Sequence, residues 1–287
     1  MAVVIAALVG VAALHSIQLE DHVVITAHRG ASGRAPENTL ASISAAIEDR
    51  ADWVEIDVQE TKDGIVVVAH DSDLKKVSGN GIKIWEATAD ELRSVDIGSY
   101  FGPNFKNERV PTLAEVLHVC KGKARVNIEL KYYGHDQDLE RKVIELVEKS
   151  AMVDDIVIMS LEASRIQKVK RLRPDWTVGL LTAVAIGDLT RAKADFLAVN
   201  SKLATREFIR SAHQKGKKVS VWTVNDKLAM SVMISRGADN LITDHPDIAR
   251  QVIAERAELS PVERILLELA FLFGTLPPSA SSPEQRF

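Results

Sequence analysis

Short apolar runs alternate with amphipathic segments along most of the 287-residue chain. Eight runs rich in apolar and β-branched residues are typical of buried strands, at 23–27, 53–58, 125–130, 156–160, 177–181, 196–199, 218–224 and 240–243. Apolar residues at helical spacing follow most of these runs, at 39–50, 138–150, 163–172, 205–215, 227–236 and 246–256. Eight strands that alternate with helices over this length predict one α/β unit, a TIM (β/α)8 barrel.

Two connections depart from the alternation. A β-like stretch at 65–69 follows the second strand, and the polar segment 71–109 behind it is too long for a simple crossover. We predict that this segment is a small insertion that overhangs the barrel mouth and shapes access to it. The other connection, residues 183–194, is weak helix at best.

An apolar segment, 1–20, precedes the predicted barrel, which spans 22–257. Residues 1–14 are wholly apolar, but they lack the Lys or Arg that opens a secretory signal and are short for a bilayer span. They could form a membrane anchor, the remnant of a longer membrane-embedded region, or a helix that caps the base of the domain. We expect a membrane-associated protein, and otherwise a cytoplasmic one.

A C-terminal segment, 260–287, follows the barrel. It opens at Pro261, and the apolar residues that continue to Phe273 predict a helix docked on the domain more than a membrane contact. The tail 277–287 is rich in Pro and Ser, which predicts disorder.

Composition narrows the choice of partners. Lys and Arg number 36 against 40 Asp and Glu, a net charge of -4, so no broad basic surface for a nucleic acid is expected. Cys120 is the single cysteine, which excludes an internal disulfide and a cysteine-built zinc site. We expect it to be a buried, small apolar side chain.

Three carboxylates are predicted to converge at the barrel mouth. Glu55 and Asp57 are two residues apart on a strand and therefore share a face, and Glu129 ends the neighbouring strand. An isolated acidic pair is usually explained by ion pairs with nearby Arg or Lys. The third acid and the adjacent histidine motif instead favour a divalent cation with oxygen ligands, Mg²⁺ or Ca²⁺, because uncompensated carboxylates raise one another's pKa.

Two histidines are placed for proton transfer. His28 follows the run 23–27 and His70 follows 65–69, so each can stand at the end of a strand. Cleavage of a phosphodiester needs one base and one acid, and these two imidazoles can divide the roles, although the sequence does not determine which takes which. The other six histidines have no comparable neighbours and are assigned no chemistry, namely His15, His22, His118, His135, His213 and His245.

Two cations complete the predicted site. Arg29 and Lys131 can bind a phosphoryl group and stabilise charge on its oxygens during displacement. Lys131 could also be an ordinary strand-end surface charge, but it shares a strand face with Glu129. Glu37 and Asn38 precede the first helix, where Asn38 could simply be an N-cap, and we interpret both as supports of the site.

These motifs, in this order, resemble the glycerophosphodiester phosphodiesterase family. They cover residues 23–256 and read His28-Arg29-Gly30, Pro36-Glu37-Asn38-Thr39, Glu55-Ile56-Asp57, His70-Asp71, Glu129-Leu130-Lys131, Trp222-Thr223-Val224-Asn225 and Thr243-Asp244-His245-Pro246. Each motif is weak alone, but the ordered set is specific. The apolar start resembles the membrane-attached branch of the family.

The resemblance implies a fold, an activity and a set of roles. It implies a TIM barrel with an insertion after His70, and a metal held by Glu55, Asp57 and Glu129. His28 and His70 would be the acid/base pair, Arg29 and Lys131 would bind the phosphate, and Trp222 would line the glycerol side. The substrates of the family are small glycerophosphodiesters, which water splits to glycerol 3-phosphate and an alcohol.

Two other functions compete with this one. Lysophospholipase D or sphingomyelinase D activity would use a similar barrel on lipid-tailed substrates, and it predicts apolar side chains around the mouth. The predicted insertion, 71–109, contains only a few such apolar side chains, for example Ile82, Ile84, Trp85, Tyr100 and Phe101. A catalytically silent barrel that binds ligands or scaffolds a membrane is the non-enzymatic alternative, and the complete set of charged motif positions argues against it.

Overall fold

Eight parallel strands close into a barrel in the computed structural model, which describes residues 23–135, 138–184 and 187–273. The strands are β1 (Val24–Ala27), β2 (Trp53–Glu60), β4 (Arg125–Leu130), β5 (Ile156–Ser160), β6 (Val178–Thr182), β7 (Phe196–Asn200), β8 (Lys218–Trp222) and β9 (Asn240–Thr243). Their order is β1-β9-β8-β7-β6-β5-β4-β2, and a β1–β2 pairing closes the ring. The predicted TIM barrel is therefore confirmed.

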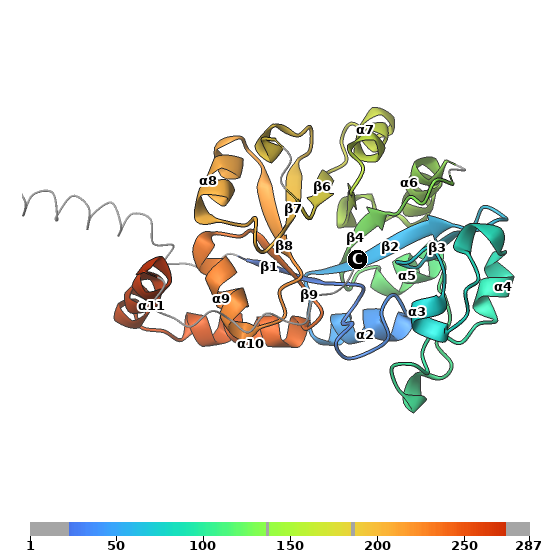
Figure 1. Ribbon diagram of the computed structural model, residues 1–287, viewed down its shortest axis with the longest axis horizontal. Helices are drawn as coiled ribbons and strands as arrows, with labels where there is room; N and C mark the ends of the chain where they lie inside the picture. Colours follow the sequence, from blue (N-terminus) through green and yellow to red (C-terminus); the bar gives the residue numbers. More distant parts are fainter. Residues whose placement is uncertain (1–22, 136–137, 185–186, 274–287) are drawn as a thin grey trace, which may run out of the picture.

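Helices surround the strands in the order expected of βα repeats (Figure 1). They are α2 (Leu40–Glu48), α5 (Leu113–Cys120), α6 (Leu139–Ser150), α7 (Ala163–Leu172), α8 (Arg206–Gln214), α9 (Lys227–Arg236) and α10 (Pro246–Ala257). Helix α5 was not predicted from the sequence, although Thr112 and Glu115 form a capping box that marks its start. Cys120, at the end of α5, is buried as predicted.

Alternation along the strands separates two environments. On β2, Val54, Ile56 and Val58 are fully buried and pack against the surrounding helices in the largest apolar cluster. The residues between them, Glu55 and Asp57, point to the other side, into the barrel. One strand thus supplies both core packing and site chemistry.

The insertion is a small packed unit of its own. A short strand, β3 (Val66–Val68), pairs antiparallel with β2 before the chain enters it. Its elements are α3 (Lys75–Ser78), η1 (Ile84–Glu86), α4 (Ala89–Arg93) and η2 (Pro103–Phe105). Although we described 71–109 as polar, its apolar residues, Leu74, Ile84 and Leu92 among them, form a buried cluster against β3. This unit lies at one end of the molecule (Figure 1).

Helix α11 (Pro261–Phe273) docks with its polar side inward. Glu268 and Arg264 are only 1% and 6% exposed, and Glu268 bonds to Arg256 of α10 and Ser235 of α9. The predicted docked helix is therefore present, with polar rather than apolar contacts at its centre. Within the described part of the chain, no helix has the length and hydropathy to cross a membrane. The predictions for 1–20 and for the tail 277–287 fall outside the described residues.

Candidate active site

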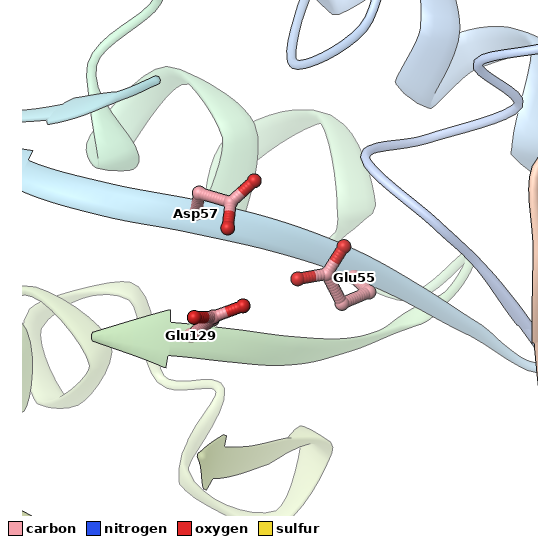
Figure 2. A group of neighbouring side chains, drawn as sticks. All are labelled: Glu55, Asp57 and Glu129. Atoms are coloured by element: carbon pink, nitrogen blue, oxygen red, sulfur yellow. The ribbon is translucent and has the colours of Figure 1, made fainter. Parts of the chain in front are cut away.

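Three carboxylates meet inside the barrel, as the sequence predicts (Figure 2). Asp57 of β2 lies opposite Glu129 of β4 in the parallel register, and Glu55 lies one inward position earlier on β2. One oxygen from each group lies within 4.8 Å of the others, and all three side chains are buried. Neighbouring strands of a parallel sheet bring these positions together because their residues are in register.

The electrostatics show how crowded these acids are. Burial, and then the charges of Asp57 and Glu129, raise the pKa of Glu55 well above its usual value. Burial and Asp57 also raise the pKa of Glu129, to about 7. Burial alone would raise the pKa of Asp57 as well, but His70, Lys131 and other neighbours outweigh it and lower that pKa. The group therefore carries two protonatable acids beside one firmly ionised acid.

The same oxygens fit a divalent cation. Among the described residues, Glu55 Oε1 and Asp57 Oδ1 are buried and have no hydrogen-bond partner. Buried carboxylate oxygens without a donor are costly unless a cation compensates them. Because all the donor atoms are carboxylate oxygens, they suit a hard divalent ion.

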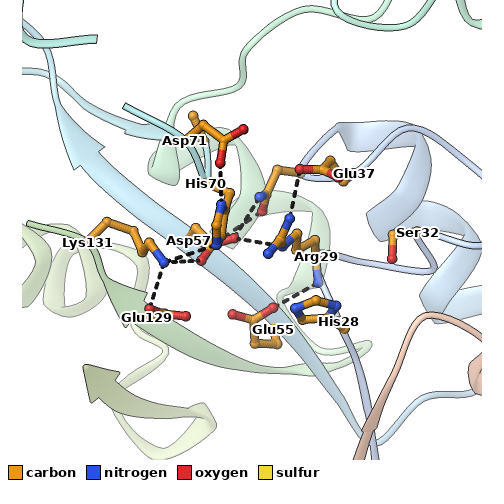
Figure 3. A network of polar contacts seen from close by, with 12 residues as sticks. His28, Arg29, Ser32, Glu37, Glu55, Asp57, His70, Asp71, Glu129 and Lys131 are labelled. Carbon is orange, nitrogen blue, oxygen red and sulfur yellow. Dashed lines mark hydrogen bonds and ion pairs between the residues drawn. The ribbon is translucent and has the colours of Figure 1, made fainter. Parts of the chain in front are cut away.

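Arg29 and Lys131 border the carboxylates (Figure 3). The Arg29 backbone nitrogen donates to Glu55 Oε2 at 2.8 Å, and its Nε lies 3.4 Å from Asp57 Oδ2. Lys131 Nζ lies 3.0 Å from Glu129 Oε1 and 3.7 Å from Asp57 Oδ1. The carboxylates do form ion pairs with Arg29 and Lys131, as the simpler interpretation of the acids expected. Two cations do not balance three carboxylates, however, so a bound cation would still be needed to neutralise the group.

Each predicted histidine is bonded to an aspartate. His28 Nδ1 lies 2.7 Å from Asp244 Oδ1, and His70 Nδ1 lies 2.7 Å from Asp71 Oδ1. His70 Nε2 also lies 3.1 Å from Lys131 Nζ, which ties this ring to the carboxylates. Asp71 and Asp244 both belong to the sequence motifs, but no role was predicted for either. Their signal is position, because each lies at the end of a β-like run.

Glu37 and Asn38, the two predicted supports, both contact charged residues of the site. Glu37 accepts from Arg29 Nη1 at 2.9 Å and from Lys76 Nζ of α3 at 2.6 Å, so it links the barrel to the insertion. Asn38 is not the N-cap, because Thr39 caps α2. Asn38 is buried instead and donates from Nδ2 to Asp57 Oδ2 at 2.9 Å.

Trp222 lies at the carboxyl end of β8. It packs against an apolar cluster in the barrel that contains Met159, Leu181 and Phe196. Its predicted contact with substrate therefore stays a prediction. His15 and His22 lie outside the described residues, and His213 pairs with Asp239.

Two clefts open beside this group. One is lined by Glu37, Asn38, His70 and Asp71 together with apolar residues of the insertion. The other is lined by Lys131, Trp85, Tyr132 and Tyr133 among others. Lys131 in one cleft and His70 in the other connect these openings to the charged group, and a concave opening with a few convergent polar groups is typical of a small-molecule site.

Comparisons with known proteins agree with this geometry. The sequence model of the glycerophosphoryl diester phosphodiesterase family matches residues 28–248. A glycerophosphodiester phosphodiesterase of Caldanaerobacter subterraneus is 33% identical over 78% of the chain and 95% of its own length. One from Bacillus subtilis is 30% identical over 81% and 87%.

A solved structure is similar in fold as well. A phosphodiesterase of Oleispira antarctica, in complex with the product sn-glycerol-3-phosphate, superposes with a TM-score of 0.77. It is 27% identical, and the match covers 84% of this chain and 99% of that one. The similarity thus spans the whole barrel, including the strands that carry the carboxylates and histidines.

Proposed function

The chain belongs to the glycerophosphoryl diester phosphodiesterase family, and from this premise we propose that it hydrolyses small glycerophosphodiesters to glycerol 3-phosphate and an alcohol. One observation carries the proposal: three buried carboxylates on adjacent strands lie beside two cations and the His70–Asp71 pair (Figure 3). The second histidine of the group, His28, is paired with Asp244. The complete constellation argues against a catalytically silent barrel.

Glu55, Asp57 and Glu129 would hold the divalent cation, which when bound neutralises their charge and polarises a phosphoryl oxygen. Either Mg²⁺ or Ca²⁺ suits carboxylate ligands, and the two differ in the rigidity they demand. Activity measured after removal of metal and addition of each ion separately distinguishes them.

The residues around the cation would act on the phosphate directly. Arg29 and Lys131 are placed to bind its oxygens, and both stay charged, because neighbouring carboxylates raise the pKa of each against the effect of burial. His28 and His70 would transfer the protons, one taking a proton from the attacking oxygen and the other giving one to the departing alkoxide.

Single replacements test these roles. We expect His28→Ala and His70→Ala each to lower kcat on glycerophosphocholine by about 100-fold or more. The products of the wild-type protein should be glycerol 3-phosphate and choline. Near-normal turnover in either variant would refute the acid/base assignment.

A second substrate class is favoured by the surface of the mouth. Tyr100 and Phe101 of the insertion and Tyr132 and Tyr133 after β4 are 37–45% exposed. Exposed aromatic side chains around a site can accommodate an apolar substituent. We propose lysophospholipids as alternative substrates. A panel of glycerophosphodiesters beside lysophosphatidylcholine, with the products identified, decides between the two classes.

Membrane association is a further proposal. Val262 and Leu266 on the outer side of α11 are 66% and 60% exposed, while the helix buries the charged residues Arg264 and Glu268. The apolar segment 1–14 leads into β1, whose start lies at the same end of the barrel as the end of α10. We expect the full chain to float with phosphatidylcholine vesicles, and Leu266→Glu or removal of 1–14 to weaken flotation. Absence of flotation in the full chain would refute this proposal.

A further inference from the structure

The carboxylate of Asp244, directly after β9, is largely buried and lies next to the His28 ring. Its Oδ1 lies 2.7 Å from His28 Nδ1 and accepts a hydrogen bond from Ser32 Oγ at 2.9 Å. Its Oδ2 accepts from Asn225 Nδ2 at 2.6 Å. The side chains of Asp244 and His28 are only 14% and 13% exposed. Three donors from two different loops, the one after β1 and the one after β8, thus fix this carboxylate.

This arrangement determines which nitrogen of His28 carries a proton. Burial alone raises the pKa of Asp244, but the contacts with His28, Asn225 and Ser32 outweigh it and hold that pKa well below its usual range. An ionised carboxylate has no proton to donate, so the proton between the two groups belongs to Nδ1. The Nε2 atom is then the one that exchanges a proton with a substrate.

Asn225 is itself held in one orientation. Its Oδ1 accepts hydrogen bonds from Thr243 Oγ1 at 3.0 Å and from the Asp244 backbone nitrogen at 2.9 Å. These two donors require the amide oxygen on their side, which places the Nδ2 donor toward the Asp244 carboxylate. The chain from Thr243 through Asn225 to Asp244 and His28 is therefore ordered at every link.

The other histidine is held more loosely. Asp71 bonds to His70 at the same distance of 2.7 Å, but its side chain is 39% exposed and His70 is 27% exposed. Water competes for a carboxylate at that exposure, and less for one that is buried.

We propose that Asp244 is a positioning residue that fixes the ring and the Nδ1–H tautomer of His28, and that Asn225 holds Asp244 for this task. The inference rests on the proposed role of His28 in proton transfer. The aspartate has no contact with the reacting atoms and acts through the imidazole alone, in the way that a buried aspartate orients the histidine of a catalytic triad.

Asp244→Asn tests the proposal with little change in shape. The new amide can donate to Nδ1, which favours the wrong tautomer, so we expect kcat on glycerophosphocholine to fall by about 100- to 10,000-fold, with KM within about twofold of the wild type. Asn225→Ala leaves the His28–Asp244 bond in place and should lower kcat by about tenfold. A kcat of Asp244→Asn within about threefold of the wild type overturns the proposal.

A double mutant separates positioning from structural support. If Asp244 acts only through His28, adding Asp244→Asn to His28→Ala should change the residual rate by less than about twofold. A further loss equal to that of the single variant overturns the proposal. Should Asp244→Asn fail to fold, Asn225→Ala carries the test, and a wild-type kcat in that variant overturns it.

A matched control and a spectroscopic readout complete the experiment. His213 and Asp239 form a pair of the same 2.7 Å distance away from the site, so Asp239→Asn should leave kcat unchanged. Nitrogen NMR of His28 should report an unprotonated Nε2 in the neutral wild-type ring and a changed tautomer in Asp244→Asn. If His28→Ala itself keeps its activity, the proposed function fails. If only Asp244→Asn keeps it, this inference alone fails.

Discussion

The two halves of the barrel interior differ in kind. The inward residues of β2 and β4 are charged or polar, with Glu55, Asp57 and Glu129 at their centre. The inward residues of β5 to β7 form an apolar cluster of Met159, Leu181, Phe196 and Ala198, with Val157 and Trp222 packed against it. One barrel therefore holds a charged half and an apolar half side by side.

The difference explains how strongly the charges act. Met159 of the apolar cluster lies beside Glu129 in the register of β4 and β5, and electrostatic interactions grow as the local dielectric falls. The pKa shifts of Glu55 and Glu129 have burial as their largest cause, ahead of any single neighbour. The apolar half thus takes part in the chemistry without contributing a reactive group.

Among the variants considered, removal of the Glu129 carboxylate from the charged half should cause the largest loss of activity. We expect Glu129→Gln to lower kcat/KM by about 1,000-fold or more, because several kcal/mol of transition-state stabilisation depend on the bound cation. The measurement is turnover of glycerophosphocholine across a titration of Mg²⁺ or Ca²⁺ after chelation. The variant should need more ion for its residual activity.

Glu268→Gln is the matched control for this change. Glu268 of α11 is also a buried glutamate, 1% exposed, but it pairs with Arg256 at 3.2 Å and Arg206 at 3.4 Å among the outer helices, and it lines neither cleft of the site. Its replacement should lower stability and leave kcat/KM within about twofold of the wild type. Equal losses of activity in the two variants would show that burial of a carboxylate, and not a metal site, explains the first result.

Carboxylate crowding also predicts a pH dependence for the metal-free protein. The folded protein keeps protons on Glu129 up to about pH 7, whereas an unfolded glutamate releases them near pH 4.5. The folded state then binds more protons in this window, so the free energy of unfolding should fall by about 1–3 kcal/mol as pH rises through it. Denaturant unfolding at a series of pH values measures this fall.

The same experiment has two internal controls. Glu55 also has a raised pKa and contributes to the fall, so Glu129→Gln, which removes one of the two acids, should reduce the fall without abolishing it. A bound divalent cation keeps both acids ionised in the folded state and should flatten the fall further. Asp57 and Asp244 have lowered pKa values, so their contribution to the free energy of unfolding does not change with pH in this window. A metal-free protein that becomes more stable from pH 4.5 to 7 would contradict the crowding of the acids.

The charged half was the part most readily predicted from the sequence. The i, i+2 spacing of Glu55 and Asp57 and the strand end at Glu129 were sufficient, because strand alternation and parallel register leave few other arrangements. Asp244 lies 216 residues from His28 in sequence, and no local pattern connects the two. Only closure of the barrel, through the pairing of β1 with β9, brings them together.

The apolar half and the insertion were harder to predict for a related reason. Phe196 and Gly179 look like ordinary strand residues, and only their register shows that the ring of one fills the space beside the other. In the insertion, short helices of three to five residues leave too little periodicity to recognise. Its buried apolar residues come together only in three dimensions.

A larger side chain inside the apolar half tests how tightly this part of the barrel is packed. A Cβ atom at Gly179 would overlap with the Phe196 ring. We expect Gly179→Ala to lower the free energy of unfolding by about 1–3 kcal/mol, and added Phe196→Leu to restore part of it. Turnover should stay within about twofold of the wild type. Undiminished stability, or a loss of turnover without a loss of stability, would contradict a purely packing role for this half.

The smallest loss of activity is expected from the ion pair between Glu37, beside the charged half, and Lys76 of the insertion. Lys76 Nζ of α3 pairs with Glu37, which also accepts from Arg29, but the lysine side chain is 51% exposed. An ion pair with so exposed a partner contributes at most about 1 kcal/mol, so Lys76→Met should lower kcat/KM by about two- to fivefold, mainly through KM.

High salt should distinguish this contact from those inside the barrel. Screening weakens exposed pairs, so the wild type and Lys76→Met should converge as ionic strength rises, while Glu129→Gln keeps its deficit. If the Lys76 deficit persists at high salt, the insertion acts on Arg29 by packing and not by charge. In that case the apolar residues of the insertion that line the cleft beside His70 would be the contacts that position Arg29.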